Sequence, residues 1–236
     1  MRDADSGYLP AMGIDYLSAL RGMERAYGAV GELATALKPQ DLLAFSRCHG
    51  WVVGDVLFHL LCDAQRALVA LASPAGGPPD RDFVTYWSGA AAEAVDPGPE
   101  ARWVRRSAAA FRDGTGIVSL WRDTAPAAVR AAGNAAPDGY ITTQGHVLAV
   151  GDLLATLATE AVIHHLDMTV ELHRAPSPHP DAMAIAARTL DGLLGAPRPD
   201  RWSMEEYLLK ATGRVSLSNA DTALLGQAAK RFPLLS

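Results

Sequence analysis

Three side chains in this sequence have the types and the spacing of metal ligands. Glu160 and His164 are four residues apart in an apolar segment that reads T-E-A-V-I-H-H-L-D from residue 159 to residue 167. On a helix this spacing places both side chains on one face, in register with Leu153 and Leu157, so we expect that face to point inward. Buried polar groups need partners, and a metal ion satisfies a carboxylate and an imidazole together.

His59 is the third candidate ligand. It belongs to a second apolar helical pattern, in which Val52, Val56, His59 and Asp63 recur on one predicted inner face. Three ligands from two helices would leave one coordination position open, which is typical of a catalytic site. Carboxylate oxygen and imidazole nitrogen are ordinary ligands for zinc and neighbouring divalent metals.

Each candidate also has an interpretation without a metal. An imidazole on an apolar helix face can be a hydrogen-bonded core residue, and a carboxylate four residues from an imidazole can simply pair with it. Cys62, one turn from His59, is either a rival ligand or a small buried apolar residue. Asp167 either accepts a hydrogen bond from the His164 imidazole or lies solvated on the surface. His165 points roughly 100 degrees away from His164, so we expect it to lie outside the site.

Composition narrows the function classes. The 236 residues carry a net charge of -5 and no long basic run, which argues against nucleic acid as a partner. No apolar stretch has the length of a membrane span, and residues 1–7 lack a signal peptide's apolar core, so we expect a cytoplasmic protein. We expect its partner to be a small molecule, and the protein to be a monomer or a homodimer. The signatures H-E-x-x-H and G-x-S-x-G, phosphate loops and dinucleotide fingerprints are absent.

The cysteines and basic residues bear on the cell of origin. Cys48 and Cys62 form no C-x-x-C pair, so we expect both to be reduced thiols. Of the 21 basic residues only Lys38, Lys210 and Lys230 are lysine, a bias that suggests a GC-rich, actinobacterial coding sequence.

Apolar periodicity predicts a mainly α protein built on an antiparallel four-helix bundle. We expect helices over residues 14–37, 52–73 and 96–130, the last interrupted at Gly114, Gly116 and Pro126, and a longest helix over 147–174. Residues 1–13 should be a poorly fixed lead-in, residues 80–98 form a lid or a short helix, and residues 140–142 are extended.

The region after three closely spaced prolines differs in kind. We expect helices over 182–194 and 202–210, a short strand over 214–217, and a closing helix that ends near residue 230 and is capped by Ser218 or Asn219. The predicted domains are therefore a metal-binding helical bundle over 1–175 and a small C-terminal α+β subdomain over 176–236.

The chain resembles the mycothiol-dependent maleylpyruvate isomerase family in three stretches. Residues 48–59 read C-H-G-W-V-V-G-D-V-L-F-H and resemble the family's C-x-G-W-x-x-x-D-L-x-x-H segment. Residues 160–167, E-A-V-I-H-H-L-D, resemble its E-x-x-x-H-x-x-D segment. The stretches A-T-G-R-V-S-L over 211–217 and R-F-P-L-L over 231–235 are similar to the tail of many actinobacterial members. The chain departs from the commonest pattern in two places, at His49, where proline is frequent, and at the insertion-like residues 75–96.

The resemblance implies a DinB-like bundle in which His59, Glu160 and His164 bind a metal, most often zinc. It further implies that a low-molecular-weight thiol, mycothiol, occupies the open position and attacks a small electrophile, giving a cis-trans isomerase or an S-transferase. The alternatives are a metal-dependent hydrolase or biosynthetic enzyme on the same scaffold, and a non-catalytic metal- or ligand-binding bundle.

Arg214 is the candidate catalytic residue outside the bundle. A guanidinium binds a carboxylate through two parallel hydrogen bonds, which lysine cannot reproduce, and Gly213 would allow the backbone to turn sharply so that Arg214 reaches the bundle mouth. The alternative is a structural arginine that is solvated or paired with Glu205 or Asp221.

Overall fold

The structure is a computed structural model that describes residues 13–87, 98–111, 113–172 and 175–235. Residues 1–12, most of the predicted lid over 80–98, and residues 173–174 lie outside this description. The helix predicted to reach residue 174 ends earlier, at Met168.

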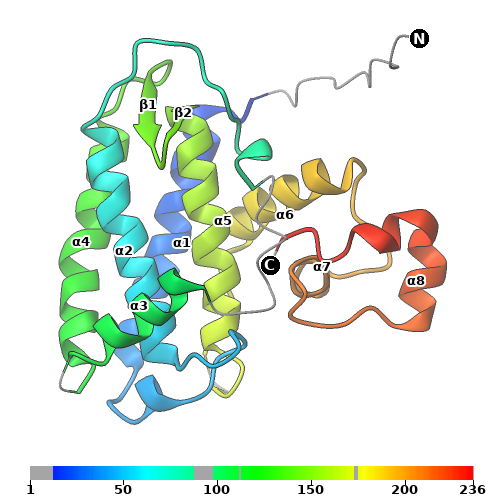
Figure 1. Cartoon of the computed structure of the whole chain (residues 1–236), viewed down its shortest axis with the longest axis horizontal. Helices are drawn as coiled ribbons and strands as arrows, with labels where there is room; N and C mark the ends of the chain where they lie inside the picture. The colour runs from blue at the N-terminus through cyan, green and yellow to red at the C-terminus, as the bar shows by residue number, and fades with distance from the viewer. Residues whose placement is uncertain (1–12, 88–97, 112, 173–174, 236) are drawn as a thin grey trace.

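Four helices form the bundle, as predicted (Figure 1). They are α1 (Tyr16–Ala36), α2 (Val53–Leu71), α4 (Thr115–Gly133) and α5 (Val150–Met168). In the view of Figure 1, α1 and α5 run downward while α2 and α4 run upward. α2 is therefore antiparallel to α5, and α1 to α4, whereas the neighbours α1 and α5 are parallel to each other, as are α2 and α4. α2 therefore faces α5, and these are the two helices that carry the predicted ligands.

α5 is the central helix. All its residues are buried except Glu160, which is partly buried, and it packs against α1, α2 and α6. A helix that is covered on every side must be apolar on every side, which explains why its few polar residues are conspicuous in the sequence. The prediction that it is the longest helix was wrong, since α1 has 21 residues and α5 has 19.

The helix predicted over residues 96–130 is two helices, α3 (Pro99–Ala108) and α4. The predicted break at Gly114 is confirmed, because this residue precedes α4 in a left-handed conformation with φ 74°. The predicted breaks at Gly116 and Pro126 were wrong, and both residues lie inside α4. Pro126 is exposed, so water can bind the backbone carbonyl whose intrahelical hydrogen bond proline removes.

A β-hairpin precedes α5. Strand β1 (Tyr140–Thr143) confirms the extended segment predicted over 140–142, and it pairs antiparallel with β2 (His146–Ala149). β2 occupies positions that we expected to begin the helix. The turn between the strands has positive φ at both Gln144 and Gly145, as tight hairpins require.

The C-terminal region is helical. α6 (Pro180–Leu194) packs against α1 and α5, and α7 (Met204–Ala211), α8 (Asn219–Leu225) and a 3-10 turn (Gly226–Arg231) follow beside the bundle. The prediction of a strand over 214–217 was wrong: these described residues form no strand. Ser218 caps α8 as predicted, but that helix ends at Leu225 rather than near residue 230.

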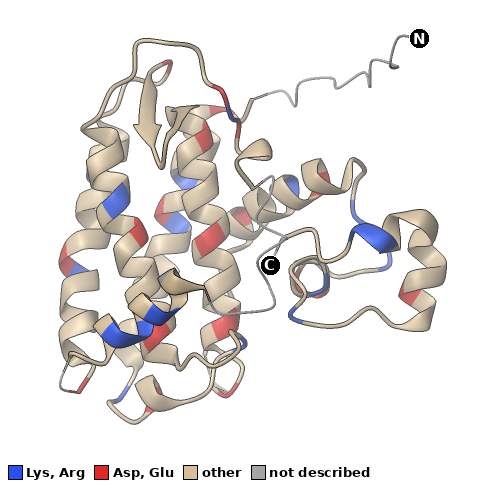
Figure 2. Cartoon of the chain, viewed as in Figure 1, with Lys and Arg blue, Asp and Glu red and all other residues tan. Residues whose placement is uncertain are grey.

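Charged residues of both signs are spread along the helices, and Arg102, Arg105 and Arg106 form a basic group on α3 (Figure 2). Within the described residues, no helix combines the length and the apolar character needed to cross a lipid bilayer.

Candidate metal centre

α2 and α5 bring the three predicted ligands together. The Nε2 atom of His164 lies 3.0 Å from Oε2 of Glu160, and Nε2 of His59 lies 3.8 Å from the same oxygen. One candidate ligand atom from each residue lies within 4.8 Å of the other two. The imidazole rings of His59 and His164 meet nearly edge to face, with centroids 4.8 Å apart.

The donor set fits a divalent metal such as zinc. Two imidazole nitrogens and a carboxylate oxygen converge on one point, which is the ligand chemistry that zinc prefers. Burial alone would raise the pKa of the Glu160 carboxyl, but hydrogen bonds to His164 and His59 outweigh it and hold this pKa well below its usual range. Glu160 is therefore an anion between two imidazoles, the protonation state that a metal ligand needs.

Asp167 holds the His164 ring in place. Its Oδ2 lies 2.9 Å from Nδ1 of His164, which confirms that this acid can accept a hydrogen bond from the candidate ligand. Burial would raise the pKa of Asp167, but the His164 hydrogen bond and the Arg214 charge outweigh it and keep this pKa well below its usual range. An ionised carboxylate only accepts hydrogen bonds, so Nδ1 of His164 donates to Asp167 and Nε2 donates to Glu160. Burial would lower the pKa of His164, but the contacts with Cys48, Asp167 and Glu160 outweigh it and raise this pKa well above its usual value. A metal at Nε2 would take the place of that proton, while Nδ1 keeps its hydrogen.

Arg214 reaches the cluster through Asp167. Its Nε donates to Oδ1 at 3.1 Å and its Nη2 donates to Oδ2 at 3.0 Å, which is a two-pronged contact with a fully buried carboxylate. Gly213, with φ 72°, makes the predicted turn before it. The acidic partner of Arg214 is therefore Asp167 rather than Glu205 or Asp221. Asp221 pairs with Lys210 instead.

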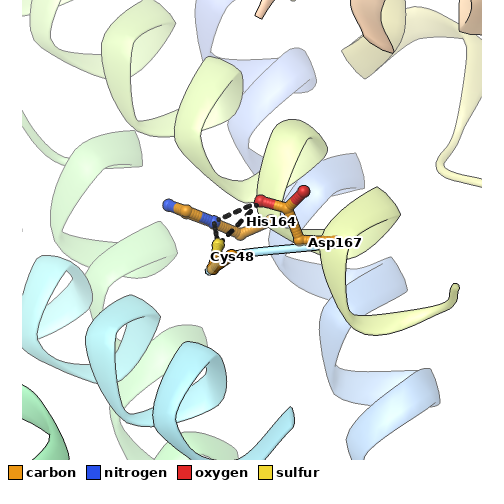
Figure 3. Close-up of side chains that lie close together, drawn as sticks. All are labelled: Cys48, His164 and Asp167. Atoms are coloured by element: carbon orange, nitrogen blue, oxygen red, sulfur yellow. Dashed lines mark hydrogen bonds and ion pairs between the residues drawn. The ribbon is translucent and has the colours of Figure 1, made fainter. Parts of the chain in front are cut away.

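Cys48 is a neighbour that the sequence reasoning missed. Its Sγ lies 3.1 Å from Oδ2 of Asp167 and 3.7 Å from Nδ1 of His164 (Figure 3). These three residues form a second group whose atoms could hold a metal. In that group Asp167 is already paired with Arg214, and the guanidinium would repel a metal cation bound to the same carboxylate. The group of His59, Glu160 and His164 is therefore the better metal site.

The signal that could have identified Cys48 is its position in the C-x-G-W segment, immediately before α2. The backbone N–H of Arg47 donates to the Asp167 carbonyl at 3.1 Å, which fixes this loop against the end of α5. Cys62, the cysteine considered as a rival ligand, belongs to neither candidate metal group of the described residues. His165 lies outside the cluster as predicted, with its Nε2 2.8 Å from the Pro176 carbonyl oxygen.

Asp63 is a further acid beside the cluster. Its Oδ2 lies 3.4 Å from Nε2 of His59, and its Oδ1 lies 3.1 Å from Nη1 of Arg66. Burial raises the pKa of Asp63 to about 6, against the opposing effect of His59. The helical pattern placed this residue on the inner face of α2, but its type and spacing alone gave no role.

A cavity of about 410 Å³ adjoins the cluster. His59 and Glu160 line it from the bundle, the apolar residues Leu153, Leu157 and Trp87 also line it, and the β-hairpin adds polar side chains. Its size suits a small organic molecule. A larger groove of about 1110 Å³ runs between α3 and the start of α2, but none of the three candidate ligands lines it.

Comparisons with known proteins bear on the fold and the family of the chain. A crystal structure of the mycothiol-dependent maleylpyruvate isomerase superposes with a TM-score of 0.57 at 13% sequence identity, covering 86% of this chain and 91% of that chain. At this identity the likeness establishes the fold. No curated protein sequence matches the chain.

The family model described as the mycothiol maleylpyruvate isomerase N-terminal domain matches residues 23–169. This range includes α2 and α5, the 48–59 segment and the three candidate ligands. The chain belongs to the mycothiol maleylpyruvate isomerase N-terminal domain family.

Proposed function

We propose that the protein is a metal-dependent enzyme that uses mycothiol as a nucleophile toward a small electrophilic substrate, and that its reaction is a cis-trans isomerisation. The observation that carries this proposal is the convergence of His59, Glu160 and His164 beside a cavity that the first two of them line, in a chain that belongs to this family. Thiolate addition to an electron-poor double bond, rotation about the resulting single bond and elimination of the thiolate would convert the cis form into the trans form.

Zinc is the metal we expect, and when bound it would lower the pKa of a thiol from about 8.5 so that the thiolate exists at neutral pH. The residues of the chain have separate tasks in this proposal. Asp167 keeps the hydrogen on Nδ1 of His164 and thereby directs Nε2 toward the cluster. Arg214 holds Asp167 through two hydrogen bonds and favours its ionised form, which keeps the acceptor for Nδ1 of His164 in place.

The same residues would also support an S-transferase, in which the thiol adduct is protonated and released instead of reverting by elimination. A hydrolase would need an activated water in place of the thiol. We expect the enzyme to work in the cytoplasm, where thiols stay reduced, and neither Cys48 nor Cys62 is a disulfide partner.

A thiol screen tests the proposal. Metal-loaded protein is incubated with mycothiol, glutathione or bacillithiol, together with maleylpyruvate or simple Michael acceptors, and the products are separated into isomers and thiol adducts. We expect turnover with mycothiol and an isomer as the main product. An adduct as the main product would make the protein an S-transferase, and complete indifference to added thiol would contradict thiol dependence and favour a hydrolase or a binding protein.

A further inference from the structure

The β-hairpin brings a second imidazole to the cavity. Thr143 of β1 pairs with His146 of β2 across the two-residue turn. Thr143, Gln144 and His146 all line the cavity that His59 and Glu160 also line. His146 is about one-third exposed, so its ring contacts both the cavity and the solvent. Among the described lining residues, His146 is the imidazole that does not belong to the metal cluster.

Asp80 fixes the orientation of the His146 ring. Its Oδ2 lies 3.2 Å from Nδ1 of His146, and its Oδ1 accepts a hydrogen bond from the Val147 backbone N–H at 2.8 Å. The Asp80 backbone N–H in turn donates to the Val147 carbonyl at 3.0 Å. Although Asp80 is exposed, these two backbone contacts attach it to β2, so the pair is a built feature of the hairpin.

The orientation determines which ring nitrogen can accept a proton. The Val147 N–H and the hydrogen bond with His146 hold the pKa of Asp80 below its usual value, so the carboxylate is ionised and only accepts. Nδ1 of His146 therefore carries the hydrogen of the neutral ring, and Nε2 keeps its lone pair. An imidazole held this way by a carboxylate is the usual form of a general base.

The proposed reaction needs such a base. A free thiol has a pKa near 8.5, so at neutral pH most of it carries a proton that must be removed before sulfur can attack. The other cavity groups are already engaged: Glu160 contacts both cluster imidazoles, and Asp63 lies between His59 and Arg66. The Tyr86 hydroxyl, from the 3-10 turn over 85–87, contacts Gln144.

We propose that His146, positioned by Asp80, is the proton acceptor for the thiol in this cavity. The inference rests on the proposed function. The S–H bond breaks, the proton moves to Nε2 of His146, and the electron pair stays on sulfur and adds to the substrate double bond. Elimination returns the pair to sulfur, and the thiol recovers its proton from Nε2 as it leaves. If the adduct is instead retained, the same proton passes to the substrate carbon next to the new C–S bond.

Counting the protons released on thiol binding tests this role without any turnover. Metal-loaded protein is titrated with mycothiol near pH 7.5 by calorimetry in buffers of different ionisation enthalpy, which gives the number of protons released to the buffer. The parent should release few protons, because the bound thiolate and the Asp80 carboxylate together stabilise the imidazolium of His146, which keeps the thiol proton. His146→Gln, whose amide can still donate to Asp80 but cannot take a proton, should release roughly one proton more per thiol bound.

Two further variants sharpen the result. Asp80→Asn keeps the imidazole but removes the ionised partner, so its proton count should lie between those of the parent and His146→Gln. His179→Gln is the matched control, because His179 also lies near an acid, with Nδ1 3.7 Å from Oδ2 of Asp181, but it does not line this cavity. Its proton count should equal that of the parent.

The outcomes separate the two proposals. Equal proton counts for the parent, His146→Gln and Asp80→Asn, with mycothiol binding retained, would overturn the role of His146 and leave the proposed function intact. Failure of the parent itself to bind mycothiol would instead remove the proposed function, and the role of His146 with it.

Discussion

At the scale of single residues, the cluster is a chain of contacts that runs from Arg214 through Asp167 and His164 to Glu160. Each link satisfies a polar group that burial would otherwise penalise. Arg214 is mostly buried, with 13% of its side chain exposed, and its planar fork matches the Asp167 carboxylate. Removal of one of these contacts should therefore change the position or charge of the residues next to it in the chain of contacts.

Arg214→Lys tests the end of this chain. A lysine ammonium cannot make both contacts with Asp167, so we expect kcat/KM to fall on the order of tenfold or more, which corresponds to about 1.4 kcal/mol. Metal content should not change, because Arg214 contacts none of the three candidate ligands directly. Arg201→Lys, at an exposed position of the same region, serves as the control and should keep parental kinetics. Unchanged kinetics in Arg214→Lys would leave that residue with a structural role only.

Sequence reasoning worked at this scale where one helix sets the geometry. The spacing of Glu160 and His164 fixes their common face, and the spacing of His164 and Asp167 allows their hydrogen bond. It failed where contacts join distant segments. Cys48 lies in a loop 119 positions from Asp167, and the true partner of Arg214 lies 47 positions away, so no periodicity could identify either pair.

At the scale of elements, the close approach of α6 to α1 depends on Gly22. A Cβ atom at this position would lie 2.6 Å from Cγ1 of Ile185 on α6, well inside van der Waals contact. Gly28, on the same helix, has no atom within 4 Å of its corresponding position. We therefore expect substitution by alanine to have opposite effects on stability at Gly22 and at Gly28.

We expect Gly22→Ala to lower the free energy of unfolding by about 1–3 kcal/mol, because the methyl group forces α6 away from α1. Gly28→Ala should instead raise it by up to about 1 kcal/mol, because alanine is the better helix former. Urea unfolding monitored by circular dichroism measures both. A stabilising Gly22→Ala would show that α6 does not pack against α1 as closely as described.

Element boundaries show what a sequence can predict and where it stops. The main bundle helices follow from apolar periodicity, and the break at Gly114 follows from glycine. The positions of β2 and of residues 214–217 did not follow, because strand formation depends on a partner strand. β2 has β1 as its partner, whereas residues 214–217 have none among the described residues.

At the scale of the whole molecule, Asp152 couples folding to pH. It lies in the first turn of α5 and is 5% exposed. Burial and the nearby charge of Asp82 raise the pKa of Asp152 to about 6, although the backbone N–H groups of Ile14 and Phe83 oppose the shift. The folded protein therefore binds a proton here more tightly than the unfolded chain does.

The sign of the pH dependence follows from linkage. Because the folded pKa is the higher one, Asp152 costs nothing below the unfolded pKa of about 4, and stability is lost as the pH rises from about 4 to about 6. Asp152→Asn removes this charge, so the free energy of unfolding of the variant, relative to that of the parent, should increase over that window and exceed it by about 2–3 kcal/mol at pH 7. Urea unfolding at pH 4.5 and pH 7 gives the comparison.

Asp200→Asn, at an exposed position, is the control and should show no such pH-dependent gain. A difference between Asp152→Asn and the parent that is the same at both pH values would argue against a raised pKa at Asp152.

The most direct test of the metal centre is elemental analysis of purified protein. We predict near-stoichiometric zinc or another divalent metal in the parent, and its loss in His59→Ala and in Glu160→Ala, with the helical circular dichroism spectrum retained in both. His179→Ala, at a partly buried histidine outside the cluster, should keep its metal. Near-stoichiometric metal that survives in both His59→Ala and Glu160→Ala would contradict the assignment of these residues as ligands.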